Sequence, residues 1–345
     1  GSASLYTLKK DSADGRFLMW KITTKAIQKQ PITGTSLGGF PAAYAETQAE
    51  YMASGKATEQ EKLVAGCPEY AFNEYLQIGL EQGLVGLALF IGWLGLLFYK
   101  GIKNKRYACC GGLMSLAIFA FSSYPLQLPE FWVVLIFLGV MSVTPDKDEI
   151  RENQAESNGH RWGKQIFFMG IAILGIGLFW MQKDHYKAYQ QWNKAQMFYN
   201  NKAYEAALEV YEPLYPLLKH KPEFLFEAAQ SLSKTGQYEK ANEYLERAVL
   251  LSSDPMLYYV MAKNEQCLGE YRQAEKHLLH AIDILPERIY PYYLLMNLYT
   301  EPSYFQPAKL KMAIDSVLTK KPKVESSAIK EMKEKARSML NNTSI

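Results

Sequence analysis

The chain has 345 residues, a hydrophobic fraction of 48% and a formal net charge of +3 at pH 7. This length allows two or three domains, and so weak a charge, with no run of lysine and arginine, argues against a nucleic-acid partner. The 4 cysteines form no Cys-x-x-Cys pair and have no histidine at metal-ligand spacing, so we expect no metal site and no disulfide framework.

The first segment, residues 1–72, is predicted to be a helical loop domain. Its stretch DSADGRFLMWKITTKAIQKQP predicts a helix over residues 15–30. Ser12 or Asp14 would be the N-cap of this helix, and Pro31 would end it.

One side of this helix is cationic and partly aromatic. Arg16 and Trp20 lie four residues apart and share a face, where the indole can stack on the guanidinium. Lys21, Lys25 and Lys29 line a neighbouring face. An ordinary solvated face, or a contact with phospholipid headgroups, is the alternative interpretation.

The stretch PITGTSLGGF follows the helix. Gly34, Gly38 and Gly39 permit tight turns or a close approach of the backbone. No P-loop lysine follows them, so we favour a turn over a phosphate cradle.

A polar cluster then runs directly into an apolar segment, in FNEYLQIGLEQGLVGL. If a helix starts near Phe72, Asn73, Gln77 and Glu81 share one face, and Glu74 lies one turn from Gln77. Carboxylates at the mouth of a membrane helix are costly unless they face a cavity or a partner. They are therefore candidate site residues, with hydrogen bonds to neighbouring helices as the alternative.

Residues 73–182 are predicted to be a membrane region with about four spans. The four apolar segments are 76–99, 107–124, 129–143 and 166–181. The last two are short, since a spanning helix needs about 20 residues. Charge-free segments with repeated glycines favour membrane helices over the buried helices of a soluble protein.

The lysines and arginines of the short loops predict the orientation. The loop KGIKNKR after the first segment is basic, as is the loop before the fourth, whereas the turn SSYPLQLPE has no lysine or arginine. The positive-inside rule therefore places both basic loops in the cytoplasm. Residues 1–72 and 185–345 would lie on the periplasmic side of a bacterial inner membrane.

The chain after the fourth segment repeats itself. Aligning KAYEAALEVY, GQYEKANEYLERAV and GEYRQAEKHLLHAI places Tyr204, Tyr238 and Tyr271 at spacings of 34 and 33. An alanine follows each tyrosine three residues later, at Ala207, Ala241 and Ala274. Tyr304 and Ala308 start a degenerate fourth copy.

This period resembles that of tetratricopeptide repeats, which we predict over residues 185–322, with a C-terminal helix or tail over 323–345. Glycine precedes the aromatic residue in two copies, and small residues let paired helices pack closely. Such an array suits a protein partner. His277 and His280 lie one turn apart, but surface or groove positions are favoured over a metal pair.

The order GRFLMW, PITGTSLGGF, Tyr44 and FNEYLQIGLEQGLVGL resembles the periplasmic loop and following span of the O-antigen ligase and polymerase superfamily. That superfamily includes bacterial protein O-oligosaccharyltransferases, and SSYPLQLPEF is similar to a turn of that branch. The resemblance covers roughly residues 10–140. It implies that this chain is the C-terminal portion of a protein with more spans.

The resemblance also implies an activity. Members transfer a glycan from an undecaprenyl-diphosphate carrier to lipid A core, to a growing glycan or to Ser/Thr of a protein, without a cofactor. Arg16 matches the arginine that engages the carrier diphosphate, and a guanidinium suits bidentate contact with phosphate. Lys21 or Lys25 would assist it. We predict Tyr44 and Gln77 as further substrate-binding residues.

The family motif HNxYL is altered in this chain. Asn73 and Tyr75 match its asparagine and aromatic residue and are predicted to bind substrate, but Phe72 occupies the histidine position. Phenylalanine cannot accept a proton. Either Glu74, which we prefer, or Glu69 assists the nucleophile, or the leaving group is good enough without a strong base.

We therefore expect an all-α membrane protein that transfers a lipid-linked glycan to an acceptor hydroxyl. The acceptor remains open between lipid A core, protein and a growing glycan. The alternatives are an O-antigen-type polymerase and a non-enzymatic scaffold, in which the spans only anchor the repeats. A transporter is not favoured, since the spans contain no clear inverted repeat.

Overall fold

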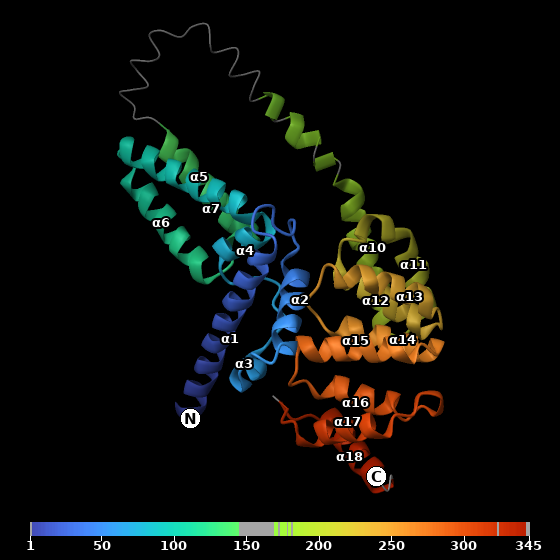
Figure 1. Ribbon diagram of the computed structural model, residues 1–345. Helices are drawn as coiled ribbons and strands as arrows, with labels where there is room; N and C mark the ends of the chain where they lie inside the picture. Colours follow the sequence, from blue (N-terminus) through green and yellow to red (C-terminus); the bar gives the residue numbers. More distant parts are fainter. Residues whose placement is uncertain are drawn as a thin grey trace, which may run out of the picture. The chain divides into compact units, whose positions relative to one another are not determined.

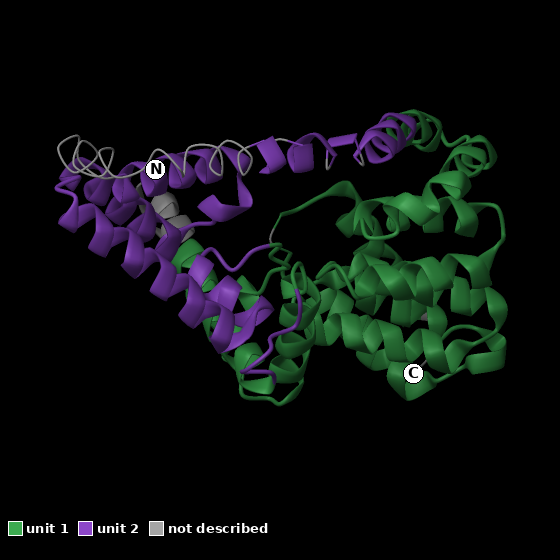
Figure 2. Cartoon of the chain, turned by 90° about the horizontal axis from the view of Figure 1, so that it is seen from above, with its two compact units in different colours: residues 1–29, 37–69, 192–345 green, residues 30–36, 70–191 purple. Residues whose placement is uncertain are grey.

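The structure is a computed structural model. It describes residues 2–144, 169–171, 173–177, 179–180, 182–322 and 324–342. Every regular element in these ranges is a helix (Figure 1). The chain forms two compact units (Figure 2): unit 1 has residues 1–29, 37–69 and 192–345, and unit 2 has residues 30–36 and 70–191.

Three helices form the N-terminal part of unit 1. They are α1 (Ser2–Lys29), α2 (Phe40–Ala53) and α3 (Glu59–Val64). Leu18, Ile22 and Ala26 recur every fourth residue on α1 and are buried, which places one stripe of the helix in the core. Helix α1 packs on both α2 and α3.

Helix α1 begins before the predicted boundary. It starts at Ser2, so the predicted N-cap residues Ser12 and Asp14 lie inside it. The Asp14 carboxylate does not cap a helix and instead accepts a hydrogen bond from Gln60 Nε2 of α3, at 3.1 Å. The end of the helix at Lys29 agrees with the predicted stop at Pro31.

The rest of unit 1 is a succession of helix pairs. The elements from this region onward are α10 (Lys183–Asn200), α11 (Tyr204–Leu218), α12 (Pro222–Lys234), α13 (Tyr238–Val249), α14 (Met256–Leu268), α15 (Tyr271–Ile284), α16 (Ile289–Leu298), η2 (Pro302–Tyr304), α17 (Pro307–Thr319) and α18 (Ser327–Asn342). Each of the three aligned tyrosines opens a helix, and the alanines three residues later are all 0% exposed. Gly236 and Gly269 end helices with φ of 82° and 80°, a conformation that favours glycine. The predicted repeat pattern is confirmed.

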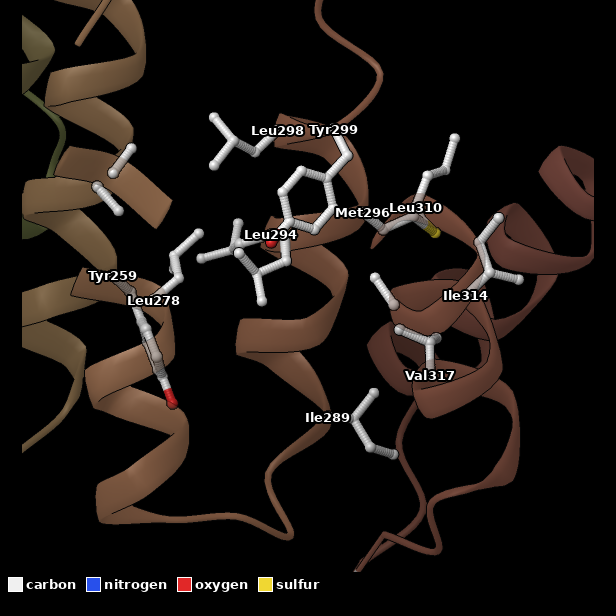
Figure 3. Close-up of a cluster of buried hydrophobic side chains, with 14 of the residues drawn as sticks. Tyr259, Leu278, Ile289, Leu294, Met296, Leu298, Tyr299, Leu310, Ile314 and Val317 are labelled. Carbon is white, nitrogen blue, oxygen red and sulfur yellow. The ribbon is translucent and has the colours of Figure 1, made fainter. Parts of the chain in front are cut away.

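The fourth copy has a different register from the one predicted. Tyr304 lies in the short helix η2, and α17 begins only at Pro307. Ala308 is exposed, whereas Leu310 fills the position that alanine takes in the other three copies. Val317 fills the position of Ala248 and Ala281 in the second and third copies. The side chains of Leu310 and Val317 lie in the apolar cluster between the last helices (Figure 3). Larger residues fit there because this pair also packs against α18.

Unit 2 contains the apolar segments. Its elements are α4 (Glu74–Glu81), α5 (Gly83–Lys103), α6 (Tyr107–Ser122), η1 (Pro125–Gln127) and α7 (Pro129–Val143). The segments predicted at 107–124 and 129–143 correspond to α6 and α7. The first predicted span, 76–99, is divided at Gln82 and reaches Lys103. The fourth, 166–181, lies partly outside the described residues.

The division between α4 and α5 depends on the loop that precedes α2. Gly34 and Gly83 have φ of 69° and 70°. Their backbones come so close together that a Cβ added to Gly83 would lie 2.0 Å from the carbonyl oxygen of Ile32. The backbone N–H of Thr35 donates to Leu80 O at 2.9 Å, and that of Leu84 donates to Pro31 O at 2.7 Å. Glycine is therefore required on both sides of this contact.

One helix in the described part of the chain, α5, is long and apolar enough to cross a membrane; α6 and α7 are shorter apolar helices. Only 11% of the most apolar stretch of α5 is buried, in contrast to the core helix of a soluble protein, which is mostly buried. Its buried Leu97 packs with Leu113 of α6 and Leu135 of α7, while most of its apolar side chains face outward. Such a surface suits contact with lipid.

Candidate functional site

The predicted site residues fall into two groups, one in each unit. Arg16, Lys21, Lys25, Tyr44 and Glu69 belong to unit 1. The others, Asn73, Glu74, Tyr75 and Gln77, belong to unit 2.

The cationic face of α1 lies beside an aromatic ring. Arg16 is exposed, and Lys21 Nζ donates to Glu61 Oε1 at 2.7 Å and to Tyr51 Oη at 2.6 Å. The ammonium groups of Lys21 and Lys25 lie 4.6 and 5.4 Å from the centroid of the Tyr51 ring. Two cations therefore share one tyrosine, which is the arrangement of a cation–π contact.

Hydrogen bonds at this contact favour the charged forms of Lys21 and Glu61. Hydrogen bonds to Glu61 and then Tyr51 raise the pKa of Lys21 above its ordinary value. Burial would raise the pKa of Glu61, but hydrogen bonds from Lys21, the Thr58 backbone N–H and Tyr51 outweigh it and lower the pKa to about 2. Sequence reasoning missed Tyr51 and Glu61, because neither is close to α1 in the chain.

Tyr44 lies inside unit 1 and not on its surface. Its side chain is buried, and its hydroxyl donates to Gln48 Oε1 at 2.7 Å. Gln48 Nε2 in turn donates to the carbonyl oxygens of Gly66 at 3.0 Å and Ile284 at 2.8 Å, so α2 is joined to α15. Glu69, by contrast, is exposed at the edge of a cleft formed with the repeats.

The polar residues at the start of α4 satisfy one another. Asn73 precedes the helix as its N-cap, and its Oδ1 accepts from the Leu76 backbone N–H at 3.0 Å. Gln77 Oε1 accepts from the Ala71 backbone N–H, and Gln77 Nε2 donates to Glu81 Oε1, both at 2.8 Å. The cluster therefore fixes the entry into α4.

Glu74 connects α4 to the turn between α6 and α7. Its Oε1 accepts from the Leu126 backbone N–H at 2.7 Å, and its Oε2 accepts from Gln127 Nε2 at 3.4 Å. The carboxylate is buried. Burial raises its pKa, against the opposing effect of these hydrogen bonds. The side chain of Glu74 therefore connects the two motifs FNEYLQ and SSYPLQ directly.

The position of the missing histidine is strained and aromatic. Phe72 has a φ of 50°, which is uncommon for a residue with a side chain. Its ring meets Tyr124 edge-on at 4.9 Å, and Tyr70 stacks on the same Tyr124 at 5.3 Å. Tyr75 donates its hydroxyl to the Ala117 carbonyl oxygen of α6 at 3.0 Å. Strain of this kind is concentrated at functional sites in proteins.

The two histidines of the third repeat face different partners. His277 Nδ1 is 2.9 Å from Glu265 Oε1, and His280 Nε2 is 3.4 Å from Glu46 Oε2 of α2. Within the described ranges, no three His, Cys, Asp or Glu side chains are placed to hold a metal ion. His280 therefore serves the contact between α2 and α15.

Two family models match parts of the chain. Residues 2–91 match the model described as O-antigen ligase, a segment that runs from α1 into α5. Residues 200–281 match the model described as anaphase-promoting complex, cyclosome, subunit 3. No curated protein matches the chain.

Several solved structures are similar to part of the chain. MamA 41-end from Desulfovibrio magneticus RS-1 is 19% identical with a TM-score of 0.36, and the match covers 46% of this chain and 98% of that one. The TPR-like repeats of a putative kinesin light chain from Podosopora anserina are 17% identical, with a TM-score of 0.36 and coverage of 46% and 88%. The Yersinia enterocolitica chaperone SycD, in complex with a peptide of the translocator YopD, is 16% identical, with a TM-score of 0.28 and coverage of 44% and 93%.

Proposed function

We propose, on the premise that residues 2–91 are an O-antigen ligase domain followed by tetratricopeptide-like repeats, that this protein transfers a lipid-linked glycan to an acceptor hydroxyl. The donor would be an undecaprenyl-diphosphate-linked glycan. The observation that carries the proposal is the family match, because it includes both the cationic face of α1 and the start of the exposed apolar helix α5.

The leaving diphosphate needs fixed positive charge. Arg16 is exposed and matches the arginine of the family's motif, and we assign to it the first contact with the diphosphate. We assign the second contact to Lys25, which lies beside Lys21 on the Tyr51 ring. A guanidinium stays charged at any physiological pH and can bind two phosphate oxygens at once. Charge stabilisation of the leaving group is the main chemical demand of such a transfer.

The role of Glu74 follows from its contacts. Both of its oxygens accept hydrogen bonds from the turn at Leu126 and Gln127, so we propose that it acts as a positioning residue for that turn. Glu69 is exposed and remains the proposed proton acceptor, if one is needed. Phe72 and Tyr124 would then form an aromatic wall where the family motif has histidine.

The chain segments that make up unit 1 support a membrane topology. Residues 37–69 and 192–345 pack in one unit, so both must lie on the same side of a membrane. The chain between them must then cross the membrane an even number of times, as four spans would. The basic residues around the end of α5 favour the cytoplasm for that end, and this supports a periplasmic position for unit 1 at a bacterial inner membrane.

The test is complementation of a deletion strain by the full protein or by Arg16→Ala. Lys10→Ala, another exposed cation of α1, is the matched control. We expect Arg16→Ala to insert normally but to lower glycan transfer at least about 100-fold, as removal of a charge-stabilising donor does. Glycans are measured on lipopolysaccharide and on proteins, and the class that is lost identifies the acceptor.

The opposite outcome has a clear meaning. If Arg16→Ala restores every glycan class as well as Lys10→Ala does, the diphosphate role is wrong. The protein is then better described as a scaffold that holds its repeats at the membrane.

A further inference from the structure

A cleft of about 810 Å³ lies within unit 1, between the Cys67–Glu69 segment and the repeats. Its other walls come from the start of α12, the start of α14 and the connection into α16. Ser253 Oγ donates to the Pro68 carbonyl oxygen at 3.2 Å, which fixes the segment against the repeats. The glycan-transfer proposal does not use this cleft, apart from Glu69 at its edge.

The charged side chains that line the cleft are mainly acidic. Four carboxylates face one cation, Arg288, and the acidic residues are Glu69, Glu223, Glu227 and Asp254. Glu69, Glu223 and Asp254 are exposed to solvent. Charges of one sign inside a concave surface focus the field and attract ligands of the opposite sign.

Glu227 is held in place by the repeats. Its Oε2 accepts from Trp192 Nε1 at 2.7 Å and from Tyr211 Oη at 3.0 Å, and its Oε1 accepts from Gln196 Nε2 at 2.9 Å. The three donors come from α10 and α11. A negative charge is thus fixed on the wall of the cleft by neutral donors, with no lysine or arginine among them.

Tyr259 supplies a second, independent observation. It lines the cleft and is only 4% exposed, yet its hydroxyl has no hydrogen-bond partner among the described residues. Figure 3 shows the hydroxyl directed away from the apolar side chains of its cluster. Tyr290 meets its ring edge-on at 5.3 Å. Buried polar groups are nearly always paired in native proteins, so this hydroxyl indicates a missing partner.

We propose that this cleft binds a segment of polypeptide that carries lysine or arginine side chains. The basic side chain lies against Glu223, Asp254 and Glu69, and a polar group of the same segment pairs with the Tyr259 hydroxyl. The excess of carboxylates is complementary to a cation, and the volume is large enough for several residues. The inference concerns binding and does not depend on glycan transfer.

The test uses the full chain in a neutral detergent and a short fluorescent peptide of alternating lysine and serine. We expect the peptide to bind, and Glu223→Gln with Asp254→Asn to weaken its binding about tenfold, because two charge contacts are removed. Glu239→Gln with Glu246→Gln is the matched control, since it removes two exposed carboxylates of α13, outside the cleft. It should bind like the wild type.

Tyr259→Phe separates a binding role from a structural one. The hydroxyl has no partner to lose within the described residues, so the melting temperature should not fall. Peptide binding should weaken about fivefold, the usual effect of one hydrogen bond.

Other results would overturn the proposal. Equal binding to the two double variants would show that the cleft charges are not used. Equal binding of a glutamate–serine peptide would remove the charge argument, and preferential binding of a neutral oligosaccharide, competed by neither peptide, would identify a glycan site instead. Unchanged peptide binding by Tyr259→Phe would exclude the hydroxyl from the site.

Discussion

At the scale of single residues, the acidic side chains of this protein differ in their hydrogen-bond partners. Glu74 is surrounded by donors of the α6–α7 turn, whereas Glu61 faces a lysine and a tyrosine. Each carboxylate therefore joins segments distant in the chain, 52 residues apart for Glu74 and Leu126 and 40 for Lys21 and Glu61. Removing one should affect the contact that it makes and leave the helices themselves intact.

Glu74→Gln and Glu74→Ala distinguish a positioning role from proton transfer. Glutamine keeps an oxygen that can accept from the Leu126 N–H, whereas alanine leaves that partly buried N–H unpaired at a cost of about 1 kcal/mol. We expect the Gln variant to retain most of the transfer rate per inserted protein and the Ala variant to lose both stability and rate. A stable Gln variant whose rate falls about 100-fold would instead make Glu74 the general base.

Glu61 should make the N-terminal helices sensitive to acid. Its pKa is lowered to about 2, so its contribution to stability is complete above its ordinary unfolded pKa and is lost as the pH falls from there toward 2. Glu61→Gln should therefore unfold more easily than the wild type at pH 7, and the difference should shrink between about pH 4.5 and 2. Hydrogen exchange of α1 and α3 as a function of pH measures this.

The control for this prediction is Glu59→Gln, which removes the exposed pair with Lys62 on the same helix α3. Surface pairs contribute little, so its stability should follow that of the wild type at every pH. A constant difference between wild type and Glu61→Gln down to pH 2 would contradict the role of the carboxylate charge.

At the scale of elements, the sequence was most informative where local pattern decides the structure. Ala207, Ala241 and Ala274 are packed in the repeats as their spacing predicts. The division at Gln82 was not predictable, because the conformation of Gly83 depends on Ile32 and Gly34, some fifty residues earlier. The partners of Glu74 and Lys21 were missed for the same reason, since they depend on tertiary contacts.

Gly83→Ala tests this long-range contact. A Cβ at this position would lie 2.0 Å from the Ile32 carbonyl oxygen, and the φ of 70° adds strain. We expect a loss of about 2–4 kcal/mol in thermal stability and less protein in the membrane. Gly92→Ala, on the same helix with nothing within 4 Å of its Cβ, is the control and should be tolerated or slightly stabilising. Equal behaviour of the two variants would contradict the close approach.

At the scale of the whole molecule, two segments of unit 1 that are distant in the chain, residues 37–69 and 192–345, pack together. This packing restricts how the chain can cross a membrane. Helix α2 packs on α15, and Gln48 joins them through the Ile284 carbonyl oxygen. Segments that pack together cannot be separated by a bilayer. The loop segment and the repeats must therefore share one aqueous compartment, whichever side that is.

Labelling of single cysteines with a membrane-impermeant maleimide tests this in intact spheroplasts. The native Cys267 is exposed on α14, and Cys67, Cys109 and Cys110 would be replaced by serine. In that background we expect Cys267 to be labelled from outside. With Cys267 replaced by serine as well, Ala53→Cys on α2 should also be labelled from outside, whereas Lys103→Cys at the end of α5 should be labelled only after lysis. Labelling of Cys267 and Ala53→Cys from opposite sides would contradict the contact between α2 and α15. Labelling of both only after lysis would keep that contact but place unit 1 in the cytoplasm, where a periplasmic glycan acceptor cannot reach it.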